Sequence, residues 1–243
     1  EAQKTLASIG TPEPETELEA IVASIHLDTS SRKESLFKRK YRVPILLAIT
    51  LAAFNQLSGI NAVLYYLNDI FVSAGFSRLS GALQAVVVGA VNLVATLLAM
   101  TLIDKLGRKA LLLIGCVGMT IGLSGVATIF STGRWHGALI YFVTGYTASF
   151  ALSSGSVIWV YMSEIFPTRV RAKGQALGST VLWVMNGIIS LVFPLLAAKS
   201  ATLPFAFFAV VMAAQFFVTL FFFPETKGLS LEELQKKLHL SEV

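Results

Sequence analysis

Six blocks of apolar residues, each long enough to cross a lipid bilayer, constrain the fold of this chain more than any other feature. A helix needs about 20 apolar residues to cross a hydrocarbon core of roughly 30 Å, and the only charged residue inside any block is Asp69. Membrane β-strands alternate apolar and polar positions, which these blocks do not. We therefore predict an all-α membrane protein with six transmembrane helices, at residues 43–71, 83–103, 110–130, 138–162, 176–198 and 203–223.

The basic residues predict how this bundle is oriented in the bilayer. Of the 19 Lys and Arg residues, only Arg78, Arg134 and Lys199 fall on the side opposite to the N-terminal segment. Because Lys and Arg accumulate in cytoplasmic loops, the other 16 predict that both ends of this chain are cytoplasmic. Loops next to anionic lipid explain the net charge of +5, and no nucleic-acid partner is expected.

Polar segments flank the bundle. Residues 1–42 form a predicted cytoplasmic linker, in which Thr16 and Glu19 have capping-box spacing ahead of an amphipathic helical pattern; a solvated helix without a partner is the alternative. Residues 224–243 form a predicted cytoplasmic tail with a second short helix after Ser230. The chain begins without Met and without the pattern of a signal peptide, so we expect further sequence upstream.

The first span carries polar residues where lipid would reject them. Asn55, Gln56, Ser58 and Asn61 surround Gly59 near the middle of the block. Since an unpaired polar group is costly in hydrocarbon, these side chains must face protein or water. A glycine lowers the cost of distorting a helix. We predict a discontinuous helix that lines a cavity at the midplane; hydrogen bonds that simply join helices are the alternative.

Other spans contribute single amides and tryptophans. Asn92 lies in the second span, Trp159 in the fourth after a serine-rich run, and Trp183 and Asn186 on one helical face of the fifth. Amides both donate and accept hydrogen bonds, and an indole adds a flat apolar face with one donor. Such a set favours an uncharged ligand rich in hydroxyl groups. Packing between helices is the alternative for Asn92 and Trp183.

The sequence offers no set of residues for catalysis or metal binding. It has no nucleophile elbow and no phosphate-binding glycine loop. The three histidines are dispersed, and the single cysteine, Cys116, lies in an apolar run. We expect a protein that is not an enzyme and that needs no metal and no cofactor. No Asp, Glu, Lys, Arg or His lies centrally in a span, so this chain alone offers no evident proton carrier.

Four motifs resemble one known family. Residues 55–66 resemble the Gln-Gln-Leu-Ser-Gly-Ile-Asn signature in the seventh helix of the sugar porter family of the major facilitator superfamily. Residues 104–109 are similar to its loop between helices eight and nine, residues 164–171 to the loop after helix ten, and residues 224–228 to its terminal signature. The resemblance covers essentially the whole chain, but only the C-terminal half of the family's twelve helices. The linker resembles the segment that joins the two halves.

The resemblance implies transport of a monosaccharide, a hexose or a pentose, by alternating access in a plasma or inner membrane. The expected partners are the sugar, the lipid bilayer and an N-terminal half of six helices, which would also handle protons if the complete carrier is a symporter. The resemblance implies proton symport as the leading mechanism of the complete carrier, with facilitated diffusion as the alternative. Tyr65 and Tyr66 match the outer gate region. The residues that resemble the family's sugar-binding set or its neighbouring pattern are Gln56, Asn61, Asn92, Trp159, Asn55, Trp183 and Asn186.

Departures from the family pattern leave the sugar unspecified. Asn55 replaces the usual first Gln, and Leu182 stands where many relatives have an amide. The serine-rich run before Trp159 lacks the prolines of animal hexose carriers. A membrane sugar sensor that does not transport, and a carrier for a polyol such as inositol, are the alternative functions.

Charged residues at the cytoplasmic helix ends predict a latch. Paired charges on one side of the membrane can hold helix bundles together in one state and separate in another. Charges that only set the membrane topology are the alternative. The predicted latch residues are Asp104, Arg108, Glu164, Arg169 and Glu225.

Overall fold

The described part of the chain is built from consecutive helices. The computed structural model describes residues 34–229 and 233–234, and these contain helices but no strand, as an all-α protein requires. The predicted linker helix after Thr16 and most of the predicted tail helix lie outside the described residues. The helices are η1 (Arg39–Tyr41), α3 (Arg42–Leu57), α4 (Ile60–Tyr65), α5 (Leu67–Ser73), α6 (Arg78–Leu106), α7 (Arg108–Thr132), η2 (His136–Ala138), α8 (Leu139–Leu152), α9 (Ser154–Ile165), α10 (Arg171–Lys199) and α11 (Thr202–Phe222).

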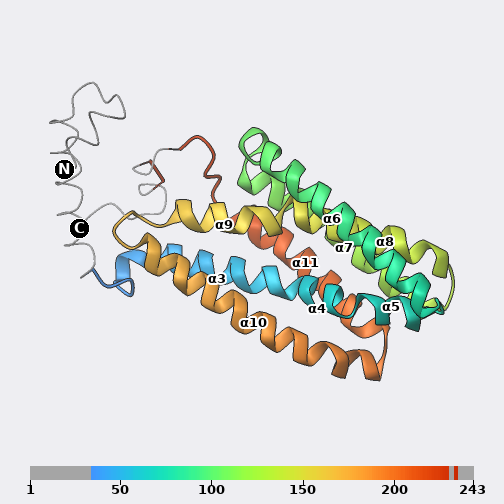
Figure 1. The fold of residues 1–243 in the computed structure, drawn as a ribbon. Coiled ribbons are helices and arrows are strands. Elements are labelled where there is room, and N and C mark those ends of the chain that lie inside the picture. The colour runs from blue at the N-terminus through green and yellow to red at the C-terminus, as the bar shows by residue number, and fades with distance from the viewer. Residues whose placement is uncertain (1–33, 230–232, 235–243) are drawn as a thin grey trace, which may run out of the picture.

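Five helical stretches within the described residues are long and apolar enough to cross a membrane, the first of them with an interruption. They are Arg39–Tyr65, Arg78–Leu106, Arg108–Thr132, Arg171–Lys199 and Thr202–Phe222. The longer ones extend past the predicted apolar blocks because the helices continue into their polar flanks. The remaining predicted span is formed by two helices, α8 and α9, placed end to end (Figure 1).

The predicted span over residues 138–162 is therefore present, but it is not one continuous helix. The helix is interrupted at Ser153, whose backbone has φ −122° and ψ −100°. A break inside a membrane is tolerated where other groups satisfy the freed backbone. Here serine hydroxyls do so, because Ser153 Oγ donates to the Ser149 carbonyl at 2.6 Å and Ser156 Oγ to the Ala151 carbonyl at 2.8 Å.

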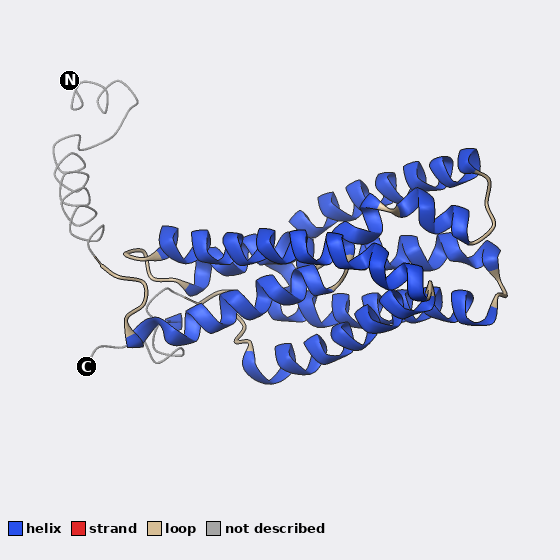
Figure 2. Ribbon diagram, turned by 90° about the horizontal axis from the view of Figure 1, so that it is seen from below, coloured by secondary structure: helices blue, strands red, loops and turns tan. Residues whose placement is uncertain are grey.

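The helices run side by side along one long axis, and α3 begins at the same end of the bundle at which α11 finishes (Figures 1 and 2). We call this end, where α3 begins and α11 finishes, the terminal end, and the other the opposite end. Helix α3 packs along α10, and α7 packs against both α8 and α11. Helices α6 and α10 leave most of their apolar residues exposed, whereas α3 and α7 bury about half of theirs.

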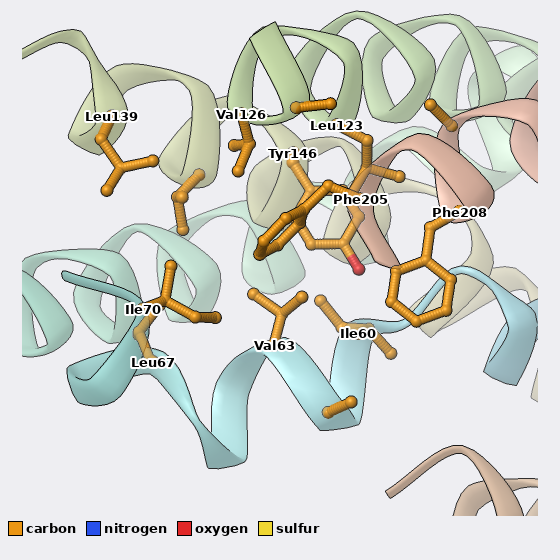
Figure 3. Close-up of a cluster of buried hydrophobic side chains, with 14 of the residues drawn as sticks. Ile60, Val63, Leu67, Ile70, Leu123, Val126, Leu139, Tyr146, Phe205 and Phe208 are labelled. Atoms are coloured by element: carbon orange, nitrogen blue, oxygen red, sulfur yellow. The ribbon is translucent and has the colours of Figure 1, made fainter. Parts of the chain in front are cut away.

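Two apolar clusters form the core, one toward each end. The opposite-end cluster includes Ile60 of α4, Met119 of α7 and Phe208 of α11; Figure 3 shows its side chains meeting between the helices. The terminal-end cluster includes Leu112 of α7 and Met162 of α9. We call the level between these clusters the polar layer. It contains the buried polar residues Asn55, Gln56, Ser58, Ser153, Ser154, Asn186 and Gln215.

Candidate functional site

The interruption of the first span lies at Ser58 and Gly59, between α3 and α4. Gly59 has φ +81°, a left-handed conformation that residues with a Cβ rarely adopt. A Cβ atom there would also lie 2.3 Å from the ring of Phe208. The freed carbonyl of Ser58 accepts a hydrogen bond from the Tyr146 hydroxyl at 2.8 Å. The discontinuous helix predicted around Gly59 is thus present, with α11 packed directly against the break.

A chain of hydrogen-bonded amides runs through the break. Asn61 Nδ2 donates to Gln56 Oε1 at 3.0 Å, and Gln56 Nε2 donates to Asn55 Oδ1 at 3.1 Å. Asn55 Nδ2 then donates to the Ser154 backbone carbonyl at 3.0 Å. Asn55 and Gln56 are buried, whereas Asn61 is half-buried. We call these four residues the amide chain, and Asn61 is its accessible end.

The amide chain joins two helix breaks that are 99 residues apart in the sequence. One lies between α3 and α4, and the other between α8 and α9 next to Ser154. The break at Ser153 was not predicted. The serine-rich run that precedes Trp159 was its only sequence signal, since serine side chains can satisfy a freed carbonyl.

Among the described residues, the remaining predicted ligands make no hydrogen bond to the amide chain. Asn92 is half-buried on α6. On α10, Asn186 is 8% exposed and accepts a hydrogen bond from Ser190 at 3.3 Å, whereas Trp183 is 61% exposed. Trp159 on α9 is also exposed. Asn186 thus belongs to the interior, and both tryptophans present their rings outside the bundle.

The two tyrosines predicted at a gate lie at a second interruption of the first span. Helix α4 ends at Tyr65, and Tyr66 separates it from α5. Tyr65 is exposed, whereas the ring of Tyr66 stacks on Phe193 of α10 with the ring centres 5.4 Å apart. The first span therefore consists of three helices, α3, α4 and α5, with one joint at Ser58 and Gly59 and a second at Tyr66.

At the terminal end, Arg108 is the centre of a network of charges. Its guanidinium forms ion pairs with Asp104 at 3.0 Å and with Glu164 at 2.8 Å, and it also donates to the Ile103 carbonyl at 3.2 Å. The second oxygen of Glu164 accepts a hydrogen bond from the Thr226 hydroxyl at 2.6 Å. These contacts join the α6–α7 turn, the end of α9 and the segment after α11.

Glu225 caps the N-terminus of α7. Its carboxylate accepts backbone N–H groups of Arg108 at 2.9 Å, Lys109 at 3.1 Å, Thr226 at 2.9 Å and Lys227 at 3.0 Å. Burial opposes ionisation of this carboxyl, but the four N–H donors outweigh burial and hold the pKa of Glu225 below its usual value.

The network includes two residues that the motifs did not predict, Gly107 and Tyr161. It does not include Arg169, which the motifs did predict. A Cβ on Gly107, where φ is +92°, would lie 2.6 Å from Glu225 Oε2, so only glycine lets the carboxylate approach the backbone. Tyr161 donates to the Pro224 carbonyl at 3.1 Å. Arg169 is exposed and makes no ion pair or hydrogen bond with the described residues. Four of the five predicted latch residues are thus engaged with each other inside this chain.

Within residues 34–229 and 233–234, no group of three or more His, Cys, Asp or Glu side chains could hold a metal ion. The site is an arrangement of neutral amides, serines and exposed aromatic rings. Neutral donors and acceptors of this kind can bind a polyhydroxylated molecule.

Comparison with known proteins identifies relatives along the whole chain. Residues 1–238 match the family described as "Sugar (and other) transporter". The chain is 35% identical over 240 residues to the arabinose-proton symporter of Bacillus subtilis, covering 97% of this chain and 52% of the relative. It is 38% identical over 200 residues to the D-xylose-proton symporter of Escherichia coli, covering 79% of this chain and 40% of the relative.

The fold is also that of a solved transporter of the major facilitator superfamily. The proton:xylose symporter XylE bound to 6-bromo-6-deoxy-D-glucose has a TM-score of 0.77 and 32% identity, over 98% of this chain and 54% of XylE. The chain spans about half the length of the relatives that it matches. Sequence, family and fold agree, and the chain belongs to the sugar transporter family.

Proposed function

We propose that this chain forms one half of a carrier that moves a monosaccharide across a membrane by alternating access. The observation that carries the proposal is the amide chain, which connects two helix breaks in the polar layer and leaves Asn61 accessible at one end. The relatives named as arabinose and xylose symporters support a sugar as the substrate.

Asn61 is the residue best placed to contact the sugar. Its Nδ2 uses one hydrogen on Gln56, so its second N–H and its Oδ1 stay available to sugar hydroxyls, which both donate and accept. The buried Gln56 and Asn55 fix the orientation of the Asn61 amide. Pre-orientation reduces the conformational entropy that binding must otherwise overcome.

The rest of the sugar site comes from a second six-helix half. The exposed Trp159 and Trp183 and the accessible Asn92 are available to such a partner, as is Arg169 at the terminal end. No Asp, Glu, Lys, Arg or His lies centrally in the spans of this chain, so proton coupling, where present, uses groups of that second half. The two joints of the first span let α4 and α5 tilt against α3, which opens and closes the site at Tyr65.

Uptake of labelled sugars by the full-length protein in vesicles, with and without a proton gradient, tests this function. We expect Asn61→Ala and Gln56→Ala to lower the affinity for the transported sugar at least tenfold. Gln175→Ala, which removes a half-buried amide near the start of α10, should leave affinity unchanged. Wild-type affinity in both site variants would refute the assignment. Uptake of inositol but of no hexose or pentose would indicate a polyol carrier, and sugar binding without uptake a sensor.

The proposed orientation places both ends of this chain in the cytoplasm of a plasma or inner membrane. Single cysteines at Lys105 and at Arg134, which lie at the two ends of the bundle, test it by labelling with an impermeant maleimide on intact cells. Cys116 is buried and contributes little background. We expect Arg134→Cys to react from outside and Lys105→Cys to react only after permeabilisation. The reverse result would contradict the orientation.

A further inference from the structure

The inward face of α11 changes from apolar to polar halfway along the helix. Toward the opposite end it carries Phe205, Phe208 and Met212, which belong to the opposite-end cluster. Gln215 and Thr219 follow at the same helical spacing, and both are 1% exposed. Two polar residues are therefore buried inside the bundle, on a helix that contributes none of the predicted site residues.

Neither side chain is paired within the described part of the chain. Gln215 Oε1, Gln215 Nε2 and Thr219 Oγ1 are all buried and make no hydrogen bond there. Each unpaired buried group costs about 1–3 kcal/mol. Several other threonines in these helices donate a hydrogen bond from the hydroxyl to the backbone carbonyl four residues earlier, and Thr219 does not. The threonines that make this bond are Thr96, Thr120, Thr128, Thr132 and Thr180.

The chemistry of these three atoms selects the ligand that can satisfy them. The amide offers a donor and an acceptor, and the hydroxyl offers both roles. A bare cation would be repelled by the Nε2 hydrogens and an anion by Oε1, and no residue of α11 carries a formal charge. Water donates and accepts at once, and buried waters in proteins make about three hydrogen bonds to otherwise unpaired groups.

We propose that Gln215, in the polar layer, and Thr219, one helical turn further toward the terminal end, hold internal water between α11 and the helices that pack on it. Ser154, in the same layer on α9, also has a fully buried hydroxyl with no hydrogen bond to the described residues. Water at this level hydrates the interior of the bundle next to Ser154, whose carbonyl ends the amide chain. The inference is independent of the transported substrate.

Hydroxyl-radical footprinting by millisecond X-ray pulses tests this proposal, because radicals formed from bound water oxidise the side chains beside it. Met212 lies three residues before Gln215 on the same face of α11 and is fully buried. Met162 is equally buried, but it lies in the terminal-end cluster with its sulfur against Gly178. In the purified full-length protein we expect Met212 to be oxidised at least fivefold faster than Met162. Equal rates would overturn the proposal without any variant.

Substitution identifies what holds the water. Gln215→Leu removes both amide groups at similar volume, and we expect Met212 oxidation to fall to the rate of Met162. Thr180→Val is the matched control, since Thr180 is exposed on α10 and its hydroxyl is paired within its own helix. It should leave the Met212 rate unchanged. Oxidation of Met212 that persists in Gln215→Leu would show that Gln215 does not bind the water, and would refute the assignment.

Discussion

Replacing Glu225 by Gln should destabilise the terminal end of the bundle by about 2 kcal/mol. Glu225 Oε1 accepts the N–H groups of Arg108, Thr226 and Lys227, and Oε2 accepts that of Lys109. In the best arrangement of a Gln side chain, its oxygen keeps the first three bonds and its NH2 group meets the N–H of Lys109. One donor then stays unpaired, which costs about 1–3 kcal/mol.

The lost charge adds to that cost. A carboxylate at a helix N-terminus is worth about 0.3–1 kcal/mol, and the three remaining bonds become neutral and weaker. Glu225 is only half-buried, so water offsets part of the loss and we take the lower part of the range. Asp104→Asn is the control, since its side chain is 77% exposed in its ion pair with Arg108 and such exposed pairs contribute about 0–1 kcal/mol.

The free energy of unfolding can be measured by SDS titration, with reaction of the buried thiol of Cys116 as the signal. The reasoning fails if Glu225→Gln lowers that free energy no more than Asp104→Asn does. The pH dependence of the free energy of unfolding provides a second test of the role of Glu225. Because the folded pKa of Glu225 lies below its usual 4.5, the stabilisation is complete above about pH 4.5 and is lost as the pH falls through the folded pKa. Wild-type stability should therefore drop more steeply below pH 4.5 than that of Glu225→Gln.

Two further substitutions test the helix break. Gly59→Ala should destabilise the protein by about 1–3 kcal/mol more than Gly75→Ala does. Both glycines have positive φ, but only at Gly59 would a Cβ meet a neighbour, which is the ring of Phe208. Equal losses of stability in SDS titration would exclude a role for that contact. Tyr146→Phe should lower the free energy of unfolding by about 1–3 kcal/mol, because it leaves the Ser58 carbonyl at the break unpaired. Tyr141→Phe is the control, since the Tyr141 side chain is exposed, and it should have no measurable effect. Similar values for the two variants would count against the hydrogen bond.

The spans and the first break could be predicted because their signals are local. A block of 20 apolar residues dictates a helix through its own backbone hydrogen bonds, and Gly59 among amides predicts a weak point within that block. The break at Ser153 was missed because serines are common in membrane helices and only some of them replace backbone hydrogen bonds. Their effect depends on Asn55, whose amide binds the carbonyl of Ser154 from another helix.

For the charged motifs too, the sequence predicts where the residues lie but not which groups they bind. Their sequence placed Arg108 and Glu225 at the same end of the bundle, which the topology of the spans already required. It could not indicate that Glu225 binds backbone N–H groups rather than a basic side chain, since backbone donors look alike in every sequence. The geometry of Gly107 decides that contact, because any Cβ there would exclude the carboxylate.

The two helix breaks and the amide chain together make one mechanical unit. Asn55 lies on α3 before the first break, and the carbonyl that it binds belongs to Ser154 at the second break, so a rotation of α9 must move Asn55 or break a buried hydrogen bond. Breaking it would leave a buried amide unpaired in a polar layer closed by apolar clusters on both sides. Asn61, at the end of the same chain of amides, is thereby sensitive to the position of α9. Asn55→Ala should uncouple Asn61 from the position of α9 and lower the affinity of the protein for its ligand. If Asn61 keeps its orientation and the affinity is unchanged in this variant, the amide chain is only structural.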